Sequence, residues 1–538
     1  MLQKIGCIGG GPGGLFFALL AKSADPSRKV TVYERNRASD TFGFGVVFSD
    51  ATLARIDEAD PVLRTALHEH GVHWDPIEVR LKGERLRCGG MGMAAVERKT
   101  LLGLLQQRAR AAGVDIRFEA SADPAELLAS DVDLIVAADG ANSGARAMFA
   151  DQFVPSVEVA TAKFIWLGTT YPFEGLTFVH QRGPHGVFAV HGYPIGNGVS
   201  TFIVETDEAS WRNAGLDSFD VNQPPGSSDE ESKSYLENLF AEQIDGASLL
   251  TNNSRWGNFR TWRTRAWSHG RMALLGDAAH TAHFSVGSGT KMAMEDAVAL
   301  AAALDRHGAD VPALLSAYEQ DRQPQVARIQ DSARPSLSWW EHFGRYHDSL
   351  QPWQFAYHFL TRSITDAQLA RRDPGFVGAS HDRWVAEHRA SPLHTPISIG
   401  AAAHGGRIVT VQRSGGNAWA ALDGGPLALH TSRPDRVGPW ALWMDAPDTE
   451  AGLPEALDLL GRAVTDDASL VVVGGGGSLT RRLLTEHARL ELGLVSVLMA
   501  DDFDSGESGV LEDWCQTMVL SGRTDLIGLT DAPTCPRT

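Results

Sequence analysis

The sequence predicts an α/β protein: a parallel, dinucleotide-binding sheet interrupted by an inserted, mainly antiparallel sheet, then a helical segment and a separate C-terminal α/β domain. Residues 3–34 read as a strand, a glycine-led helix and a β-branched strand. Residues 151–270 alternate strand-like runs with turns. The apolar run "RMALLGD" at 271–277 then returns the chain to the first sheet.

Bulk composition restricts the class of protein. The chain has 538 residues, 43% hydrophobic and 21% charged, which is ordinary for a globular protein of about three domains. A formal net charge of −18 without a basic block argues against nucleic acid, since a phosphate-binding face needs clustered Lys and Arg. Four cysteines without metal-like spacing favour a reducing cytoplasm and no metal site. No window reaches about 18 consecutive apolar residues, so we expect no membrane span.

The turn after the first strand carries a dinucleotide fingerprint. Gly9, Gly11 and Gly14 have the required spacing, and Glu34 stands twenty positions after the last of them. In this pattern the first glycine permits the turn, the second lets the backbone approach a pyrophosphate, the third packs helix on strand, and the acid bonds a ribose hydroxyl. The neighbours that complete the expected cofactor-binding segment are Pro12, Gly13 and Arg35. The alternative is a tight glycine turn that binds no ligand.

Two later strand ends have an unusual composition. The run "DVDLIVAADGANSGAR" passes from an apolar strand into Asp139 and Gly140, with Ser143 and Arg146 behind them. The run "GDAAHTAHFSVGSGTKMAMEDA" at 276–297 crosses histidines and glycines before it opens an alanine-rich helix. A loop whose backbone must lie against a ligand fits this composition better than a simple connection does.

These elements place the domain boundaries. Residues 1–150 and 270–330 are expected to form the dinucleotide-binding domain, and residues 151–269 the inserted substrate-binding sheet. Residues 331–390 are expected to be a helical segment and linker, and residues 391–538 a C-terminal α/β domain. The run "DRWVAEHRASPLHTPISIG" at 382–400 is expected to be the linker between them.

The fingerprint with Glu34, the "DGxxSxxR" run and "GDAAH" together resemble the flavoprotein aromatic hydroxylases, single-component monooxygenases with FAD in one Rossmann-type domain. The resemblance covers roughly residues 1–375. His283, Phe284 and Lys291 stand where many of those enzymes have prolines and an asparagine. These departures, with "FGFGVVFSD", "IWLGT", "STFIVE" and "WGNFRTWR", are similar to the aryl-coenzyme A hydroxylases of salicylyl-CoA and 2-aminobenzoyl-CoA and a related indole hydroxylase. "FAYHFLTRS" and "LARRDP" favour the salicylyl-CoA branch.

The resemblance implies which residues contact FAD. The glycine fingerprint would bind the ADP half of the cofactor. Asp277 would contact the ribityl chain or the pyrophosphate region, and Arg98 the phosphate side of the flavin. Asp139 is associated both with FAD and with the transient nicotinamide cofactor, NAD(P)H.

The helix start near residue 290 has a further implied role. A helix N-terminus carries free N–H groups and partial positive charge, which would stabilise the anionic reduced flavin. The backbone amides expected there belong to Gly287, Gly289 and Thr290. An ordinary glycine-rich helix entry is the alternative.

The resemblance also implies the reaction. NAD(P)H would reduce FAD, O2 would add at the flavin C4a atom, and the resulting hydroperoxide would hydroxylate a small-molecule aromatic ring. The cofactor carries this chemistry, so no nucleophile or metal cluster is required. For a salicylyl-CoA-type thioester, attack would occur para to the ring hydroxyl. An indole, a carrier-protein-bound aryl group and a non-catalytic flavin-binding redox module stay open as alternatives.

The candidate residues around the ring follow from the strands and loops near the predicted flavin site. A histidine or tyrosine could share the proton of the ring substituent, and the candidates are His191, Tyr193 and His283. Walls that keep water from the reacting oxygen are expected from Phe44, Val46 and Phe284. A strand histidine that only satisfies its neighbours is the plainer reading of His191.

The C-terminal segment is expected to be structural. "PLHTPISIG" and "GRTDLIGL" faintly resemble the start and the end of an old-yellow-enzyme barrel, which suggests a shortened remnant without its own flavin. The turn "VVVGGGGSLTRRLL" has Leu479 in place of the third fingerprint glycine, so a second nucleotide site is disfavoured. A dimerisation role, and hence a homodimer, stays open.

Overall fold

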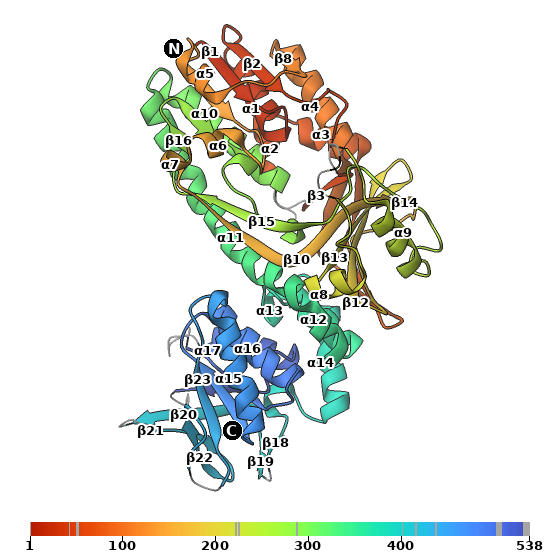
Figure 1. The fold of residues 1–538 in the computed structure, drawn as a ribbon, viewed down its shortest axis with the longest axis vertical. Coiled ribbons are helices and arrows are strands. Elements are labelled where there is room, and N and C mark those ends of the chain that lie inside the picture. The colour runs from red at the N-terminus through yellow and green to blue at the C-terminus, as the bar shows by residue number, and fades with distance from the viewer. Residues whose placement is uncertain are drawn as a thin grey trace. The chain divides into compact units, whose positions relative to one another are not determined.

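The computed structural model describes residues 2–41, 43–49, 53–220, 223, 226–286, 289–400, 402–414, 417–435, 438–501 and 508–530. The chain divides into two compact units, Met1–Glu341 and His342–Thr538 (Figure 1). Helix α11 (Val311–Ser349) crosses this division. The predicted α/β class, with a parallel sheet, an inserted sheet and a separate C-terminal domain, is confirmed.

The parallel sheet of the first unit has the strand order β16-β17-β9-β1-β2-β8. All neighbouring pairs run parallel except β16 and β17, which lie at one edge. Its strands are β1 (Lys4–Ile8), β2 (Lys29–Glu34), β8 (Asp115–Phe118), β9 (Leu134–Ala137), β16 (Ser268–His269) and β17 (Met272–Leu274). Strands β9 and β17 are buried at every position, as expected for a sheet covered by helices on both faces.

Helices complete this domain. Their bounds are α1 (Pro12–Ala24), α4 (Arg98–Ala112), α5 (Pro124–Ala129), α6 (Gly144–Met148), α7 (Ala150–Phe153) and α10 (Gly289–His307). Helix α1 packs against both α4 and α10, so the glycine turn that precedes α1 is held next to the chain that returns after residue 270.

The insert sheet has eight strands, in the order β14-β10-β13-β12-β11-β5-β6 with β15 paired to β10. It is antiparallel except where β11 pairs with β5, so it recruits a hairpin from before residue 90. Its strands are β5 (Ile77–Leu81), β6 (Glu84–Cys88), β10 (Pro155–Thr169), β11 (Thr177–Gly183), β12 (Gly186–Gly196), β13 (Val199–Thr206), β14 (Leu249–Leu250) and β15 (Gly257–Thr264).

Successive side chains along each strand point to opposite sides, so the insert sheet has two different faces. One face is an apolar core that contains Ile165, Leu167, Phe188, Val190, Phe202 and Val204. The register of β10, β12 and β13 brings onto the other face Phe164, Trp166, His191, Tyr193, Thr201 and Glu205. We call this second face the aromatic face; it carries both His191 and Glu205.

Smaller elements fill the first unit. They are β3 (Gly45–Ser49), β4 (Val72–Trp74), β7 (Met93–Glu97), α2 (Ala54–Ala59), α3 (Val62–His70), α8 (Glu208–Asn213) and α9 (Glu230–Leu239). Strands β3, β7 and β4 form a separate antiparallel sheet. This sheet leads directly into α4, and so positions Arg98 at the start of that helix.

The second unit contains a closed barrel of seven strands. The strands are β20 (Ile408–Ser414), β21 (Asn417–Leu422), β22 (Gly425–His430), β23 (Ala441–Asp445), β24 (Leu470–Gly474), β25 (Ser496–Met499) and β26 (Leu526–Leu529). Helices α15 (Leu453–Thr465), α16 (Ser478–Leu490) and α17 (Ser508–Leu520) alternate with the last four strands, the pattern of a TIM-type barrel. A short pair, β18 (Ile397–Ile399) and β19 (Ala402–His404), precedes the barrel.

The glycine turn after β24 packs against the protein itself. A Cβ on Gly476 would lie 1.9 Å from the carbonyl oxygen of Ala446, and one on Gly477 would lie 2.7 Å from that of Asp448. Gly475 and Gly476 also have positive φ. Tight packing therefore accounts for these glycines without a second nucleotide.

The segment before the barrel is more helical than the sequence indicated. Helices α12 (Pro352–Leu360), α13 (Asp366–Ala370) and α14 (Pro374–His388) occupy it. Part of the expected linker, from residue 382 to 388, thus continues α14. The Asp373 side chain caps this helix, and Pro374 occupies its first turn, so the local signals favour a helix start at this point.

A buried charge network stabilises the second unit. Glu486 lies 3.2 Å from Arg345, 3.4 Å from His358 and 3.6 Å from Arg523, and it also accepts a hydrogen bond from Tyr346. Burial, supported by the positive charge of Arg523, lowers the pKa of His358 to about 3. The side chain therefore stays neutral in the folded protein at pH values where an unfolded chain would protonate it.

This difference predicts a loss of stability on acidification. The pKa of His358 is lower in the folded protein than in the unfolded chain, where it is near 6.5. The contribution of His358 to the free energy of unfolding is therefore present above pH 6.5 and is lost as the pH falls below that value. The free energy of unfolding should decrease by up to about 1.4 kcal/mol per pH unit between roughly pH 6 and pH 5. Calorimetry of wild-type protein and His358→Asn over this range measures the effect. Identical pH slopes for the two proteins would contradict it.

Candidate active site

In the fingerprint turn, packing excludes a side chain at some of the glycines but not at Gly11. A Cβ on Gly9, where φ is +104°, would lie 2.3 Å from the Ala138 carbonyl oxygen, and one on Gly14 would lie 2.3 Å from that of Gly9. A Cβ on Gly13 would collide with Leu275 at 2.5 Å. At Gly11 it would meet nothing within 4 Å. The missing side chain at Gly11 thus leaves open space at the start of α1.

The start of α1 is suited to an anion. Gly11 is the N-cap residue and offers no side-chain cap, and Pro12 occupies the first turn without an N–H of its own. The free N–H groups at this end, together with the helix dipole, favour a phosphate.

Glu34 at the end of β2 holds the turn in place. One carboxylate oxygen accepts a hydrogen bond from the Gly10 N–H at 2.7 Å, and the other accepts from the Asn36 N–H and side-chain amide at 2.8 Å each. The contact of Glu34 with a ribose stays a prediction. Arg35, the next residue, is exposed.

Arg98 and Asp277 lie close enough to influence each other. Burial lowers the pKa of Arg98, and the nearby Tyr193 and Asp277 oppose that shift. The guanidinium carbon lies 5.8 Å from the ring centroid of Trp166. Among the described residues, the buried Arg98 Nε has no hydrogen-bond partner. The surrounding protein raises the pKa of Asp277, although its carboxylate still reaches solvent.

The "DGxxSxxR" run joins two strand ends. Asp139 accepts a hydrogen bond from the Ala145 N–H at 3.2 Å through one oxygen, and its other oxygen is buried without a partner among the described residues. Ser143 caps α6. Arg146, 3% exposed, donates to the carbonyl oxygens of Asp277 and Ala278 at 3.3 and 2.9 Å. The run therefore fixes the backbone on both sides of Asp277.

A buried ionic network holds the turn that contains Asp277. Asp296 on α10 accepts a hydrogen bond from the Gly276 N–H at 3.0 Å and lies 2.7 Å from His280 and 2.8 Å from Arg322 on α11. Asp296 and Arg322 are fully buried. The short helix η2 (Gly276–Ala278), which contains Asp277, is thereby tied to two long helices.

The structure describes part of the helix start that is predicted to face the flavin. Helix α10 begins at Gly289, where an added Cβ would meet nothing within 4 Å, and Thr290 follows at a half-buried position. Gly287 lies outside the described residues. Lys291 forms an ion pair with Glu295 at 2.9 Å on the same helix.

The aromatic face brings together His191, His283 and Phe284. The His191 ring lies 5.5 Å from that of Phe284 and 4.3 Å from that of Trp340 on α11. Phe284 also packs 5.8 Å from Trp166, the ring beneath Arg98. These contacts connect Arg98 and Trp166 with the strand that carries His191.

Tyr193 and the predicted walls lie nearby with different surroundings. The Tyr193 hydroxyl donates to the Gly45 carbonyl oxygen at 3.3 Å, and burial raises its pKa to about 12. Phe44 lies against Gly168, where an added Cβ would approach its ring to 2.6 Å. Val46 is buried within the main apolar core of the first unit.

The structure adds residues that the sequence patterns did not single out. Glu205 on β13 is 1% exposed and lies 3.1 Å from His191 Nε2, and Trp340 is fully buried with its ring 4.3 Å from that of His191. The available signal for Glu205 was strand alternation in "STFIVE", which puts the acid on the face of Thr201. Trp340 comes from a distant helix and has no comparable signal.

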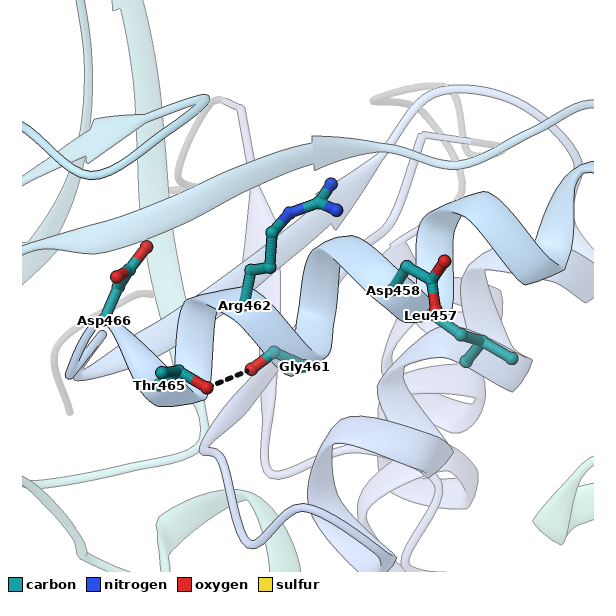
Figure 2. A pocket seen from close by; sticks show the side chains of 6 residues that line it. All are labelled: Leu457, Asp458, Gly461, Arg462, Thr465 and Asp466. Carbon is teal, nitrogen blue, oxygen red and sulfur yellow. Dashed lines mark hydrogen bonds between the residues drawn. The ribbon is translucent and has the colours of Figure 1, made fainter.

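In the second unit, a shallow hollow runs along α15 (Figure 2). It is lined by Leu457, Asp458, Gly461, Arg462, Thr465 and Asp466. These residues all belong to or directly follow one helix, and Thr465 only bonds the Gly461 carbonyl oxygen one turn earlier. None of the sequence-predicted site residues lies in this groove.

Two kinds of feature are absent from the described part of the chain. It contains no group of three or more His, Cys, Asp or Glu side chains placed to hold a metal ion. Within the same residues, no helix is both long and apolar enough to cross a membrane.

Comparisons with known proteins identify relatives of this chain. The family model described as "FAD binding domain" matches residues 3–333. The salicyloyl-CoA 5-hydroxylase of a Streptomyces species is 58% identical over 98% of this chain and 99% of its own. The 3-hydroxy-4-methyl-anthranilyl-[aryl-carrier protein] 5-monooxygenase of Streptosporangium sibiricum is 38% identical over 62% of this chain and 87% of its own. The solved structure of 2-methyl-3-hydroxypyridine-5-carboxylic acid oxygenase aligns with a TM-score of 0.51 at 22% identity, over 64% and 94% of the two chains.

The open space at Gly11 yields a testable prediction. Gly11→Ala should leave the apoprotein folded, because φ is −73° and nothing is within reach of the new Cβ, but should weaken FAD binding at least about tenfold by blocking the pyrophosphate approach. The change in unfolding free energy should stay below about 1 kcal/mol. Calorimetry of the apoprotein and flavin fluorescence titration measure the two effects.

Two glycine variants serve as controls. Gly14→Ala should lower stability itself by about 1–3 kcal/mol, since its Cβ would collide with the Gly9 carbonyl oxygen. Gly103→Ala, exposed on α4 with open space around it, should change neither property adversely. Wild-type FAD affinity in Gly11→Ala would show that the pyrophosphate lies elsewhere.

Proposed function

Because the chain belongs to the FAD-binding-domain family of flavin-dependent aromatic monooxygenases, we propose that it hydroxylates salicyloyl-coenzyme A, para to the ring hydroxyl. The resemblance drawn from the sequence motifs is confirmed, and the protein is an enzyme that uses FAD with NAD(P)H and O2. The substrate and the residue roles are the proposal.

One observation carries the choice of substrate. The relative named as a salicyloyl-CoA hydroxylase matches 98% of this chain, through both units. The relative named for a carrier-protein substrate matches only 62% of it. The barrel unit is therefore shared with the relative whose substrate is a coenzyme A thioester, which favours a CoA thioester over a carrier-bound group.

The residues of the first unit fit bound FAD. Gly11 leaves open space at the anion-binding start of α1, while Arg98 Nε and one oxygen of Asp139 are buried polar atoms without partners among the described residues. We assign the pyrophosphate to the α1 start and Arg98, and the ribityl region to Asp277. When bound, FAD would supply the reducing equivalents taken from NAD(P)H and the activated oxygen that is transferred.

Protein residues would then orient the ring and exclude water. Phe284, Trp166 and Trp340 offer aromatic surfaces around His191. His191 is placed to accept the proton of the ring hydroxyl, which increases electron density at the para carbon. Tyr193 keeps its own proton in this environment, since its pKa is raised to about 12.

A thioester also suits the charges of the aromatic face better than a free acid does. Lys163 lies on the opposite face of the sheet, where it donates to Asn258 at 2.9 Å and lies over the ring of Trp211, and Arg182 is exposed at the far end of β11. Glu205 instead places a carboxylate beside His191. A substrate carboxylate buried here would face a like charge, whereas a thioester is neutral.

We also propose a reducing, cytoplasmic location for the enzyme. Three cysteines, Cys7, Cys88 and Cys515, are buried as free thiols. Burial raises the pKa of Cys7 and of Cys515 to about 12, so both stay protonated and unreactive.

The substrate proposal predicts a clear preference. Salicyloyl-CoA should stimulate NADH or NADPH oxidation and yield a product heavier by one oxygen atom, with kcat/KM at least about tenfold above that of free salicylate, a difference of about 1.4 kcal/mol. Product mass and oxygen consumption measure it. Benzoyl-CoA, which lacks the activating hydroxyl, is the control and should give no hydroxylated product. Equal coupled turnover of salicylate would refute the thioester proposal.

A further inference from the structure

We propose that Glu205 is a positioning residue that fixes both His191 and His283, and that it supplies the counter-charge when His191 takes the proton of the substrate hydroxyl. The inference rests on the proposed function and extends it to a residue that lies in the run "STFIVE" but was not predicted to be a site residue. The step in question is removal of the proton from the ring hydroxyl of the substrate, which protein side chains must carry out because the flavin does not.

One carboxylate oxygen contacts two imidazoles. Glu205 Oε1 lies 3.1 Å from His191 Nε2 and 3.6 Å from His283 Nε2. The three side chains come from β12, β13 and the loop before η3 (Phe284–Val286), and none is more than 4% exposed. A carboxylate buried on an otherwise aromatic surface is costly unless such partners offset its desolvation.

The contacts on the far side of His283 settle its tautomer. The Ser285 backbone N–H lies 3.3 Å from His283 Nδ1, and the Ser285 hydroxyl lies 2.8 Å from the same atom. A backbone N–H can only donate, so Nδ1 accepts, and the ring proton of neutral His283 is on Nε2, facing Glu205. The N–H of His283 thus faces the carboxylate, 3.6 Å away.

The same logic applies to His191. With Nε2 facing the carboxylate oxygen, its favoured neutral form carries the proton on Nε2 and leaves Nδ1 as the basic nitrogen. When the O–H bond of the substrate breaks, the proton forms an N–H bond on His191, and the phenolate keeps the electron pair. The resulting imidazolium lies beside Glu205, whose negative charge favours this state.

Packing contacts also connect His283 with His191. Its ring lies 4.2 Å from that of the adjacent Phe284, which itself touches His191 at 5.5 Å. Ser285 continues the chain to Ser336 on α11 at 2.9 Å. Glu205 therefore couples the orientation of the base to the loop that precedes the flavin-side helix α10.

Other ionisable groups lie on the elements that pack here. They include His180 on β11, Tyr193 on β12, Arg98 on α4, and the Arg334–Glu341 pair on α11. All of them are retained when Glu205 alone is replaced, so a comparison of variants isolates the carboxylate.

The test titrates the hydroxyl of bound salicyloyl-CoA. With oxidised FAD enzyme and no reductant, difference absorbance of the salicyl ring follows its ionisation as the pH is raised. Glu205→Gln should move the midpoint upward by at least about one pH unit, because the imidazolium loses its counter-charge. Product formation in the complete reaction should fall about 10- to 100-fold. A merely structural role would leave the midpoint in place.

Two further variants make the experiment decisive. Glu205→Asp keeps the charge at a longer distance and should give an upward shift smaller than that of Glu205→Gln; it also serves if the glutamine variant does not fold. Asp229→Asn removes another buried carboxylate, one that caps α9 through Ser232, and should leave the midpoint unchanged.

The outcomes separate the two proposals. Unchanged midpoints in both Glu205 variants, with wild-type enzyme active on the thioester, would overturn the role of Glu205 alone. A wild-type enzyme that binds salicyloyl-CoA without hydroxylating it would overturn the proposed function, whatever the midpoints show.

Discussion

The buried carboxylate of Asp296 is the constraint on which the cofactor side of the structure depends. It binds the Gly276 N–H, His280 and Arg322 at once, and so joins the end of β17 to α10 and α11. Removing one partner from a buried pair of this kind costs about 3–5 kcal/mol, since the remaining charge has no compensation. Among the described residues, the side chain of the neighbouring Asp277 forms no hydrogen bond with these helices, and it is exposed to solvent.

The insert sheet imposes the second constraint through its two-residue period. Phe202 and Val204 point into an apolar core, so Thr201 and Glu205 must lie on the opposite face. A slip of one residue would exchange these sets and bury the acid in the core. Stability of the core and placement of the ionisable groups are therefore one property of the same strands.

The sequence predicted the fold class and the cofactor turn because both depend on local patterns. Glycine spacing, a following acid and strand periodicity are contained within residues 3–34, and the fold requires Gly9 and Gly14 as expected. Glu34 proved to hold the turn as well, a role that the ribose rule does not reveal. The helical nature of residues 382–388 was missed, although Asp373 and Pro374 signal the start of α14.

The substrate side was less accessible to sequence reasoning. His191 and His283 were identified as separate candidates, but their shared contact with Glu205 depends on strand register and on a loop some 80 residues away. Trp340 reaches the same place from α11. Such contacts arise from tertiary packing, which a single sequence without aligned relatives does not reveal.

The place of β17 in the parallel sheet has a consequence for how the protein comes off the ribosome. Its neighbour β9 ends at residue 137, yet β17 begins only at residue 272, after the whole insert sheet has been made. Such a long sequence separation makes closure of the sheet slow, because the chain must order the insert before the pair can form. The nascent N-terminal strands therefore stay incomplete through much of translation. Helix α10, which packs against α1 next to the glycine turn, is likewise made only after the insert.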